Sequence, residues 1–183
     1  KITPEGVSSV LGTTGNFPWA ITVDQSGNVY TANVSSNDVS KITPDGVSSI
    51  LGTTGDYPWA IALDSEGNIF TANTLSGDVS KITPSGVSTI FATIGEYSAL
   101  RGIAIDEENN IYVPSLTYGN VSKITSSGTV TLFGTTGSAP SDIAVDGDRN
   151  VFTANRDSEN VSRITPFGNS TIIAYTGSAT AGI

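Results

Sequence analysis

Residues 41–80, KITPDGVSSILGTTGDYPWAIALDSEGNIFTANTLSGDVS, form the unit from which the whole chain is built. Residues 1–40 match this stretch at 27 of 40 positions, and most of the differences are conservative. Further copies begin at Lys81, Lys123 and Arg163, so successive starts are separated by 40, 40, 42 and 40 residues. A repeat of this length is typical of propeller blades.

Each unit predicts four short β-strands and no helix. Runs rich in Val, Ile, Thr and aromatic residues alternate with Gly, Pro, Asn and Asp, and no segment keeps an apolar period of 3.6 residues. From the second unit into the third, we expect strands at residues 59–64, 68–73, 78–83 and 87–93, joined by antiparallel hairpins. The connections at 64–68 and 84–86 contain the Asp, Pro and Gly residues of tight turns.

These strands predict an all-β fold, a β-propeller built of four-stranded antiparallel blades that stack on one another through both faces. The strand at 59–64 is apolar on both faces and is expected to lie innermost. The chain would contain four complete blades plus two N-terminal strands, as a partial or open ring. We place these parts approximately at residues 1–14 (the two strands), 19–54, 59–94, 101–136 and 141–176 of a single propeller spanning residues 1–183.

Both ends of the chain predict an incomplete ring. Residues 1–14 match only the last two strands of a blade, and residues 179–183 align with residues 139–143, inside a first strand. Because rings of four to eight blades are usual, we expect part of a propeller of six or more blades, or closure through another chain. The lack of Met at position 1 agrees with processing or a longer chain. Exposed blade edges would favour self-association.

Composition excludes several classes of site. The chain has no Cys and no His, which removes thiolate nucleophiles, imidazole bases and the commonest zinc ligands. Its net charge is −9, and five of its eight basic residues occupy one repeated position, so we expect no nucleic-acid partner. No apolar run approaches the roughly 18 residues of a membrane helix, so we expect no membrane insertion. The acidic, Thr- and Asn-rich repeats predict a secreted or cell-surface protein.

The pattern PWAIALDSEGNIFTAN at residues 58–73 resembles an NHL-type propeller repeat, and its TAN ending resembles the YVTN repeats of surface proteins. The resemblance covers the whole chain and implies a propeller fold. It does not imply one activity, because that superfamily includes binding scaffolds, signalling modules, lactonases and lyases. Its streptogramin lyase-like members are expected to use histidine, and its gluconolactonase-like members use a Glu, Asn and Asp metal cluster that has no clear match here.

The candidate binding face is the end of the propeller that carries the connections from the fourth strand of one blade to the first strand of the next. We call it the upper face; the loops between second and third strands share it. Aromatic rings flanked by polar side chains are typical of sugar-binding and peptide-binding surfaces. The candidate ligand-binding residues are Phe17, Trp19, Asn33, Tyr57, Trp59, Asn73, Tyr97 and Arg101. The alternative is that each tryptophan only packs against the next blade.

The third unit departs most from the repeat. It gains two residues in the connection at 96–101, places Arg101 at the tryptophan position, and replaces TAN by VPS at 113–115. Such a departure marks either a site or neutral drift. Loops with inserted residues on a rigid scaffold often carry function, so Arg101 stays among the candidates.

Acidic turns recur after each first strand, at Asp24, Asp64, Asp106 and Asp146. Residues 146–150, DGDRN, resemble the opening of a calcium loop but lack the glycine that should follow, so turn chemistry explains them without metal. We expect no cofactor, calcium being the only candidate. The run from Asp106 to Glu108 is predicted to be solvated at a hairpin tip. The repeated Lys/Arg position is predicted to lay its stem over the neighbouring blade.

Near-identical repeats place the same side chains around a ring, whereas catalysis needs different residues that converge on one point. We therefore interpret the protein as a non-enzymatic binding or interaction module that recognises a glycan or a protein through its upper face, and we assign no catalytic residue. Two alternatives stay open. One is a metal-dependent lyase or hydrolase centred in the channel, and the other is a self-assembling filament or surface-layer subunit.

Overall fold

The computed structural model describes residues 1–96 and 98–176. These residues form sixteen β-strands. They contain no helix that is long and apolar enough to cross a membrane.

The strands form four separate antiparallel sheets, each with four strands in sequence order, and each sheet is one blade. Blade 1 contains β1 (Pro18–Val23), β2 (Val29–Asn33), β3 (Asp38–Ile42) and β4 (Ser48–Thr53). Blade 2 contains β5 (Pro58–Leu63), β6 (Ile69–Asn73), β7 (Asp78–Ile82) and β8 (Ser88–Thr93). Blade 3 contains β9 (Ala104–Ile105), β10 (Ile111–Ser115), β11 (Asn120–Ile124) and β12 (Val130–Thr135). Blade 4 contains β13 (Pro140–Val145), β14 (Val151–Asn155), β15 (Asn160–Ile164) and β16 (Ser170–Tyr175).

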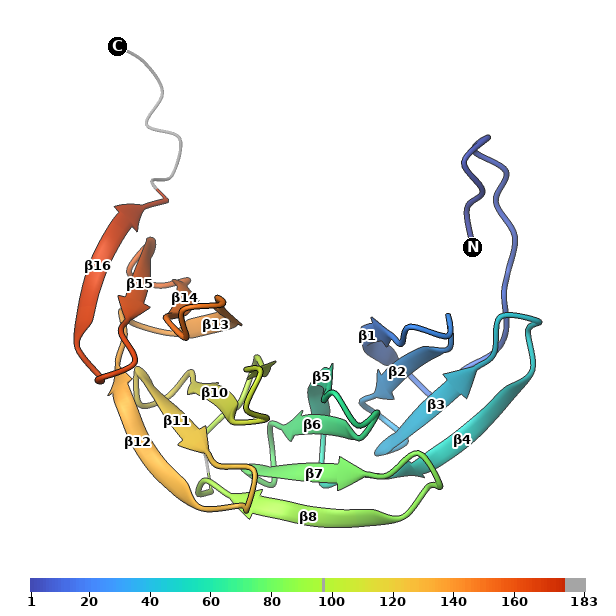
Figure 1. Cartoon of the computed structure of the whole chain (residues 1–183), viewed down its shortest axis with the longest axis horizontal. Helices are drawn as coiled ribbons and strands as arrows, with labels where there is room; N and C mark the ends of the chain where they lie inside the picture. Colours follow the sequence, from blue (N-terminus) through green and yellow to red (C-terminus); the bar gives the residue numbers. More distant parts are fainter. Residues whose placement is uncertain (97, 177–183) are drawn as a thin grey trace.

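The blades stand side by side along an open arc, with blade 1 and blade 4 at its two tips (Figure 1). Strands β1, β5 and β13 lie toward the concave inner side, and β4, β8, β12 and β16 lie on the convex outer side. Along the inner side β1 contacts β5, β5 contacts β9, and β9 contacts β13. The structure confirms the predicted all-β propeller architecture with an open ring.

The hydrophobic core lies between the blades. Tyr30 and Val39 of blade 1 share a buried cluster with Ile69 and Ile82 of blade 2. The corresponding repeat positions form the clusters between blades 2 and 3 and between blades 3 and 4. A four-stranded sheet of this size cannot bury enough apolar area alone, so stacking is what stabilises each blade.

The first blade lacks a complete neighbour on one side. Ile21 is 66% exposed, whereas Ile61 at the same position of blade 2 is partly buried against blade 1. Before β1, residues 1–9 form a hairpin with one bridge, between Ile2 and Ser8, in the region where two strands were expected. Leu11 and Ile21 line a cavity of about 580 Å³ between this segment and blade 1. The N-terminal segment therefore covers this face only in part.

The repeated lysines lie beside aromatic rings of their own blades, and Lys81 also lines a cleft with Asn109 and Ser126 of blade 3. Lys41 pairs directly with Tyr30 in the β2–β3 ladder, and its Nζ lies 5.8 Å from the centroid of that ring. Lys81 and Lys123 lie in the same way over the rings of Phe70 and Tyr112. The sheet register places each ammonium beside an aromatic ring of its own blade, where a cation–π contact stabilises it.

Candidate functional site

The two sets of loops assigned to the upper face lie together, as predicted. The connections between blades are hydrogen-bonded to the loops between second and third strands. The Val34 amide donates to the Phe17 carbonyl at 3.0 Å, and the Thr74 amide donates to the Tyr57 carbonyl at 2.9 Å. Each connection is therefore fixed to the blade that it enters.

A left-handed residue recurs in each of these connections. Phe17, Tyr57, Ala99 and Ala139 have φ angles of 58°, 65°, 48° and 54°. For a bulky side chain this conformation is unfavourable, by about 1–2 kcal/mol, and strained residues of this kind cluster at ligand-binding sites. The turn places the Phe17 and Tyr57 rings beside the tryptophan two residues further along the chain.

The aromatic side chains of blades 1 and 2 stack with Arg101 of blade 3. The ring centroids of Trp19 and Trp59 are 4.2 Å apart, and the Arg101 Cζ lies 3.8 Å from the Trp59 ring centroid. Phe17 stacks on Trp19 and Tyr57 stacks on Trp59, each at 6.0 Å. We call these five residues the aromatic ladder. Trp19 packs against the next blade, as the alternative reading expected, yet it remains 50% exposed.

A groove of about 320 Å³ lies beside the ladder. Residues from the first-strand region of all four blades line it, including Trp19, Trp59, Arg101, Ser141 and Asp142. Sequence reasoning missed Ser141 and Asp142 as site residues. Their repeat position could have indicated them, because Ser141 occupies in the fourth unit the position that a tryptophan occupies in the first two.

Asn33 and Asn73 were candidate ligand contacts, but the structure places both inside the blades, with no exposed surface. The Asn73 Nδ2 donates to Asp78 Oδ1 at 2.6 Å and to Ser80 Oγ at 2.8 Å, and the Thr71 hydroxyl donates to Asn73 Oδ1 at 2.9 Å. Asn33 makes the same three contacts in blade 1. We call this arrangement the asparagine hub. It holds the upper loop, so we do not keep these asparagines in the proposed site.

The hub also explains the glycine that ends each TTG sequence. The Gly55 amide donates to Ser80 Oγ at 2.9 Å, and a Cβ at Gly55 would lie 2.5 Å from Asp78 Oδ1. A larger residue would therefore displace the hub. The remaining candidate, Tyr97, lies outside the described residues.

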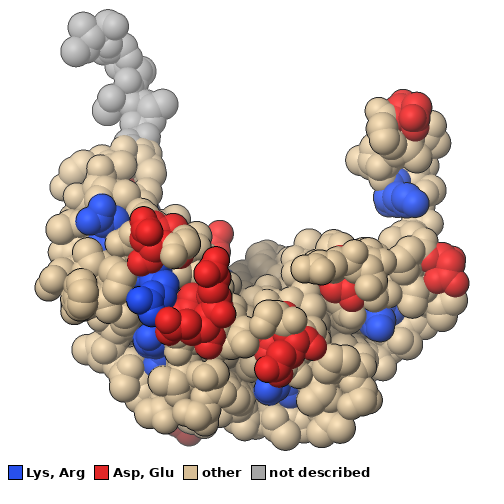
Figure 2. Space-filling view, viewed as in Figure 1, with Lys and Arg blue, Asp and Glu red and all other residues tan. Residues whose placement is uncertain are grey.

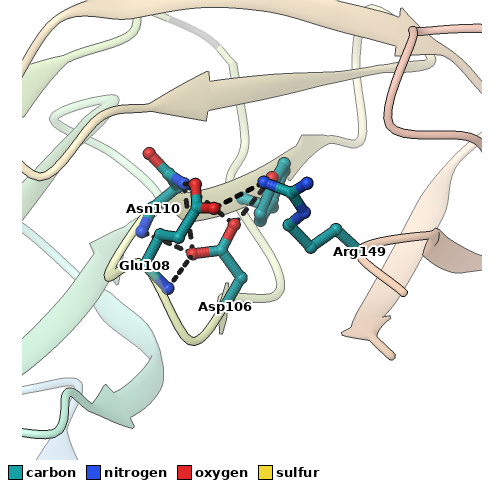
Figure 3. Close-up of polar contacts among 5 residues, drawn as sticks. Asp106, Glu108, Asn110 and Arg149 are labelled. Carbon is teal, nitrogen blue, oxygen red and sulfur yellow. Dashed lines mark hydrogen bonds and ion pairs between the residues drawn. The ribbon is translucent and has the colours of Figure 1, made fainter. Parts of the chain in front are cut away.

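At the opposite end of the blades, Asp106 is 6% exposed, so the prediction that it is solvated is wrong. Figure 3 shows its polar contacts. Its carboxylate accepts hydrogen bonds from the backbone and side chain of Asn110 and from the Tyr112 hydroxyl. Burial raises the pKa of Asp106, but these hydrogen bonds outweigh it and hold the pKa below its ordinary value. Glu108 reaches across to blade 4, where its Oε1 accepts from Arg149 Nη1 at 2.6 Å.

Acidic side chains gather in several groups on the face seen in Figure 2, with basic side chains among them. Within residues 1–96 and 98–176, no group of three or more acidic residues is arranged to hold a metal ion. At the calcium-like sequence, the Asp146 carboxylate accepts hydrogen bonds from the backbone and side chain of Asn150, which is ordinary turn chemistry.

Residues 2–183 match the model of the virginiamycin B lyase family. The chain belongs to this family. The assignment confirms a propeller repeat protein, but it does not support the NHL type in particular. No curated protein matched the sequence.

Solved structures of lyases share the fold. A streptogramin B lyase superposes with a TM-score of 0.80 at 21% identity, over 86% of this chain and 54% of that chain. The virginiamycin B lyase of Staphylococcus aureus gives a TM-score of 0.78 at 22% identity, over 86% of this chain and 55% of that chain. A Bacteroides thetaiotaomicron protein of unknown function gives a TM-score of 0.68 at 17% identity, over 90% of this chain and 45% of that chain. The chain thus spans about half the length of these structures.

Proposed function

We propose that this protein is a secreted or surface-displayed binding module that recognises a glycan or a protein through its upper face. The observation that supports the proposal is the half-exposed stack of Trp19, Trp59 and Arg101 beside a groove that also contains Ser141 and Asp142. Aromatic faces supply contact area, and the few polar groups fix the orientation of a ligand.

The groove is asymmetric although the blades are repeats. One repeat position carries tryptophan in blades 1 and 2, Arg101 in blade 3 and Ser141 in blade 4. Different groups therefore converge on one groove, which is what selective binding needs. A relative also supports ligand recognition: a catalytically inactive histidine-to-alanine variant of the Staphylococcus aureus lyase, 23% identical to this chain, was crystallised with quinupristin.

Glycan and protein arrays probed with the purified chain test this function. We expect discrete hits whose affinity falls at least tenfold in a Trp19→Ala, Trp59→Ala double variant. Phe167→Ala is the matched control, because Phe167 is 91% exposed in a hairpin turn away from the ladder. If the double variant binds every hit as well as the parent, the ladder is not the binding site.

A lyase is the second candidate, and family membership favours it. The 183 residues include no histidine, so elimination would depend here on other groups or on residues outside this sequence. Incubation with quinupristin, followed by chromatography and mass spectrometry, tests the activity. A new product with no gain of water supports the lyase, and recovery of unchanged quinupristin at high enzyme concentration argues against it.

Self-association through the open faces of blades 1 and 4 is a separate proposal. It is supported by exposed apolar side chains such as Ile21 on blade 1 and Ile173 on blade 4. Sedimentation over a wide range of protein concentration tests it. A single 18.8 kDa species at every concentration would exclude it.

A further inference from the structure

Arg101 carries a polar atom that no described residue satisfies. Its Nε is the one buried side-chain nitrogen or oxygen, within residues 1–96 and 98–176, that has no hydrogen-bond partner. The two ion pairs found among these residues do not involve it. A buried donor without an acceptor is unfavourable, so an acceptor supplied by a ligand would stabilise the Arg101 guanidinium.

A second arginine acts electrostatically on the first. Burial lowers the pKa of Arg101, and the positive charge of Arg156 lowers it further. Arg156 follows β14, and its amide donates to the Ala139 carbonyl at 3.0 Å in the upper-face connection of blade 4. Its Nε donates to Asp157 Oδ1 at 2.7 Å, on a side chain that is 60% exposed. Arg156 therefore already has an acidic partner, whereas Arg101 has none among the described residues.

These cations differ from the other basic residues of the chain. Five of the eight occupy one repeated position, which for four of them lies in the third strand of a blade, and Arg149 pairs with Glu108 at the opposite end of the blades. In a chain with a net charge of −9, the Arg101 guanidinium, which lines the aromatic groove and has no acidic partner among the described residues, gives a local preference for an anion. The planar guanidinium fork matches the geometry of a carboxylate in particular.

The remaining polar groups of the groove favour a ligand rich in hydroxyl groups. Asp142 is exposed and lines the groove, and one of its carboxylate oxygens accepts from the Ile143 amide at 2.9 Å. A carboxylate can accept further hydrogen bonds, and sugar hydroxyls are suitable donors. The same negative charge disfavours a ligand that is densely anionic. The exposed indole of Trp19 offers a flat apolar face on which a sugar ring can stack.

We propose that the groove binds an acidic saccharide, a sugar carrying a single carboxylate per ring. The carboxylate is held by Arg101, a ring stacks on Trp19, and hydroxyl groups donate to Asp142. This inference rests on the proposed binding function and names its ligand class.

The test compares trigalacturonic acid with its neutral methyl ester, which has the same rings and hydroxyl groups. Tryptophan fluorescence titration of the whole chain should show the acid binding at least tenfold more tightly than the ester. The preference should weaken when NaCl is raised from 50 to 500 mM, because salt screens the arginine–carboxylate attraction. In Arg101→Gln the acid should bind about tenfold more weakly, while the ester should bind as it does to the parent.

Arg149→Gln is the matched control, since it removes the same charge at the opposite end of the blades and should leave the binding of both probes unchanged. Arg101→Trp, which restores the residue of blades 1 and 2, keeps the test usable if Arg101→Gln does not fold. Equal affinity for acid and ester, or binding of neither probe, would overturn this inference. Array hits that depend on Trp19 and Trp59 would still support the proposed binding function. Failure of the acidic-saccharide inference can therefore be distinguished from failure of the proposed function.

Discussion

Blades 2 and 3 differ most clearly at their inner and upper ends. The inner strand of blade 2, β5, has six residues, whereas β9 of blade 3 has two. Blade 2 fixes its upper loop with the Asn73 hub. In blade 3, Ser115 stands in that position; its hydroxyl donates to the Ser98 carbonyl at 2.7 Å and accepts from the Tyr118 amide at 3.1 Å.

The altered connection of blade 3 creates a contact that the regular blade lacks. Leu100 is fully buried, bridges to Ser115, and accepts a hydrogen bond on its carbonyl from Thr74 of blade 2 at 2.6 Å. The next residue, Arg101, then lies over Trp59. Blade 3 thus lacks part of the inner strand and the hub, and it places an arginine at the groove where blades 1 and 2 place a tryptophan. The comparison teaches that the departure from the repeat is coupled to the candidate site.

Removing the hub of blade 2 should have the largest effect. Asn73→Ala deletes three hydrogen bonds and leaves the buried polar groups of Thr71, Asp78 and Ser80 without that partner. We expect a loss of about 3 kcal/mol in the free energy of unfolding, measured by urea titration. Ser115→Ala in blade 3 should cost about 1 kcal/mol, because two hydrogen bonds of an ordinary hydroxyl are lost. An equal loss in the free energy of unfolding for the two variants would mean that the Asn73 hub stabilises its blade no more than Ser115 does.

The acidic hairpin of blade 3 should give a smaller, pH-dependent effect. Asp106 accepts from the Tyr112 hydroxyl, whereas blade 2 has Phe70 at that position. Because the folded pKa of Asp106 lies below its ordinary value of 3.8, its stabilisation is present above about pH 4 and is lost as the pH falls toward the folded pKa. Asp106→Asn should therefore cost about 2 kcal/mol at pH 7. Thermal unfolding from pH 7 to pH 2 should show the difference from the parent shrinking below pH 4; a constant difference would contradict the assignment.

The ion pair between blades 3 and 4 should matter least. Glu108 and Arg149 are 60% and 48% exposed, and such surface pairs stabilise by about 0–1 kcal/mol. Arg149→Gln should lower the free energy of unfolding by about 0.5 kcal/mol at low salt and by less at 1 M NaCl. A double-mutant cycle with Glu108→Gln measures the coupling. A coupling above 2 kcal/mol would show that this contact, and not the apolar cluster, dominates the junction.

The repeat pattern predicted the strands to within about one residue in blade 2, because Gly, Pro and Asp mark each turn locally. The candidate site was predicted in part. Trp19, Trp59 and Arg101 are brought together, since one repeat position always points to the same place on successive blades. The buried roles of Asn33 and Asp106 were missed, because burial depends on partners from other strands and loops that a single strand does not reveal.

The sequence by itself determined that the chain is an all-β repeat protein, where its turns lie, and which residues occupy equivalent positions. These follow from local conformational preferences and from a period that can be counted. Only the tertiary structure decided which polar side chains face inward. It placed Asn73 in a hub rather than on the surface, paired Lys41 with a ring of its own blade, and left the Arg101 Nε buried without a described acceptor. The physical reason is that hydrogen bonding and desolvation depend on three-dimensional neighbours, whereas turns and strands depend on residues adjacent in the chain.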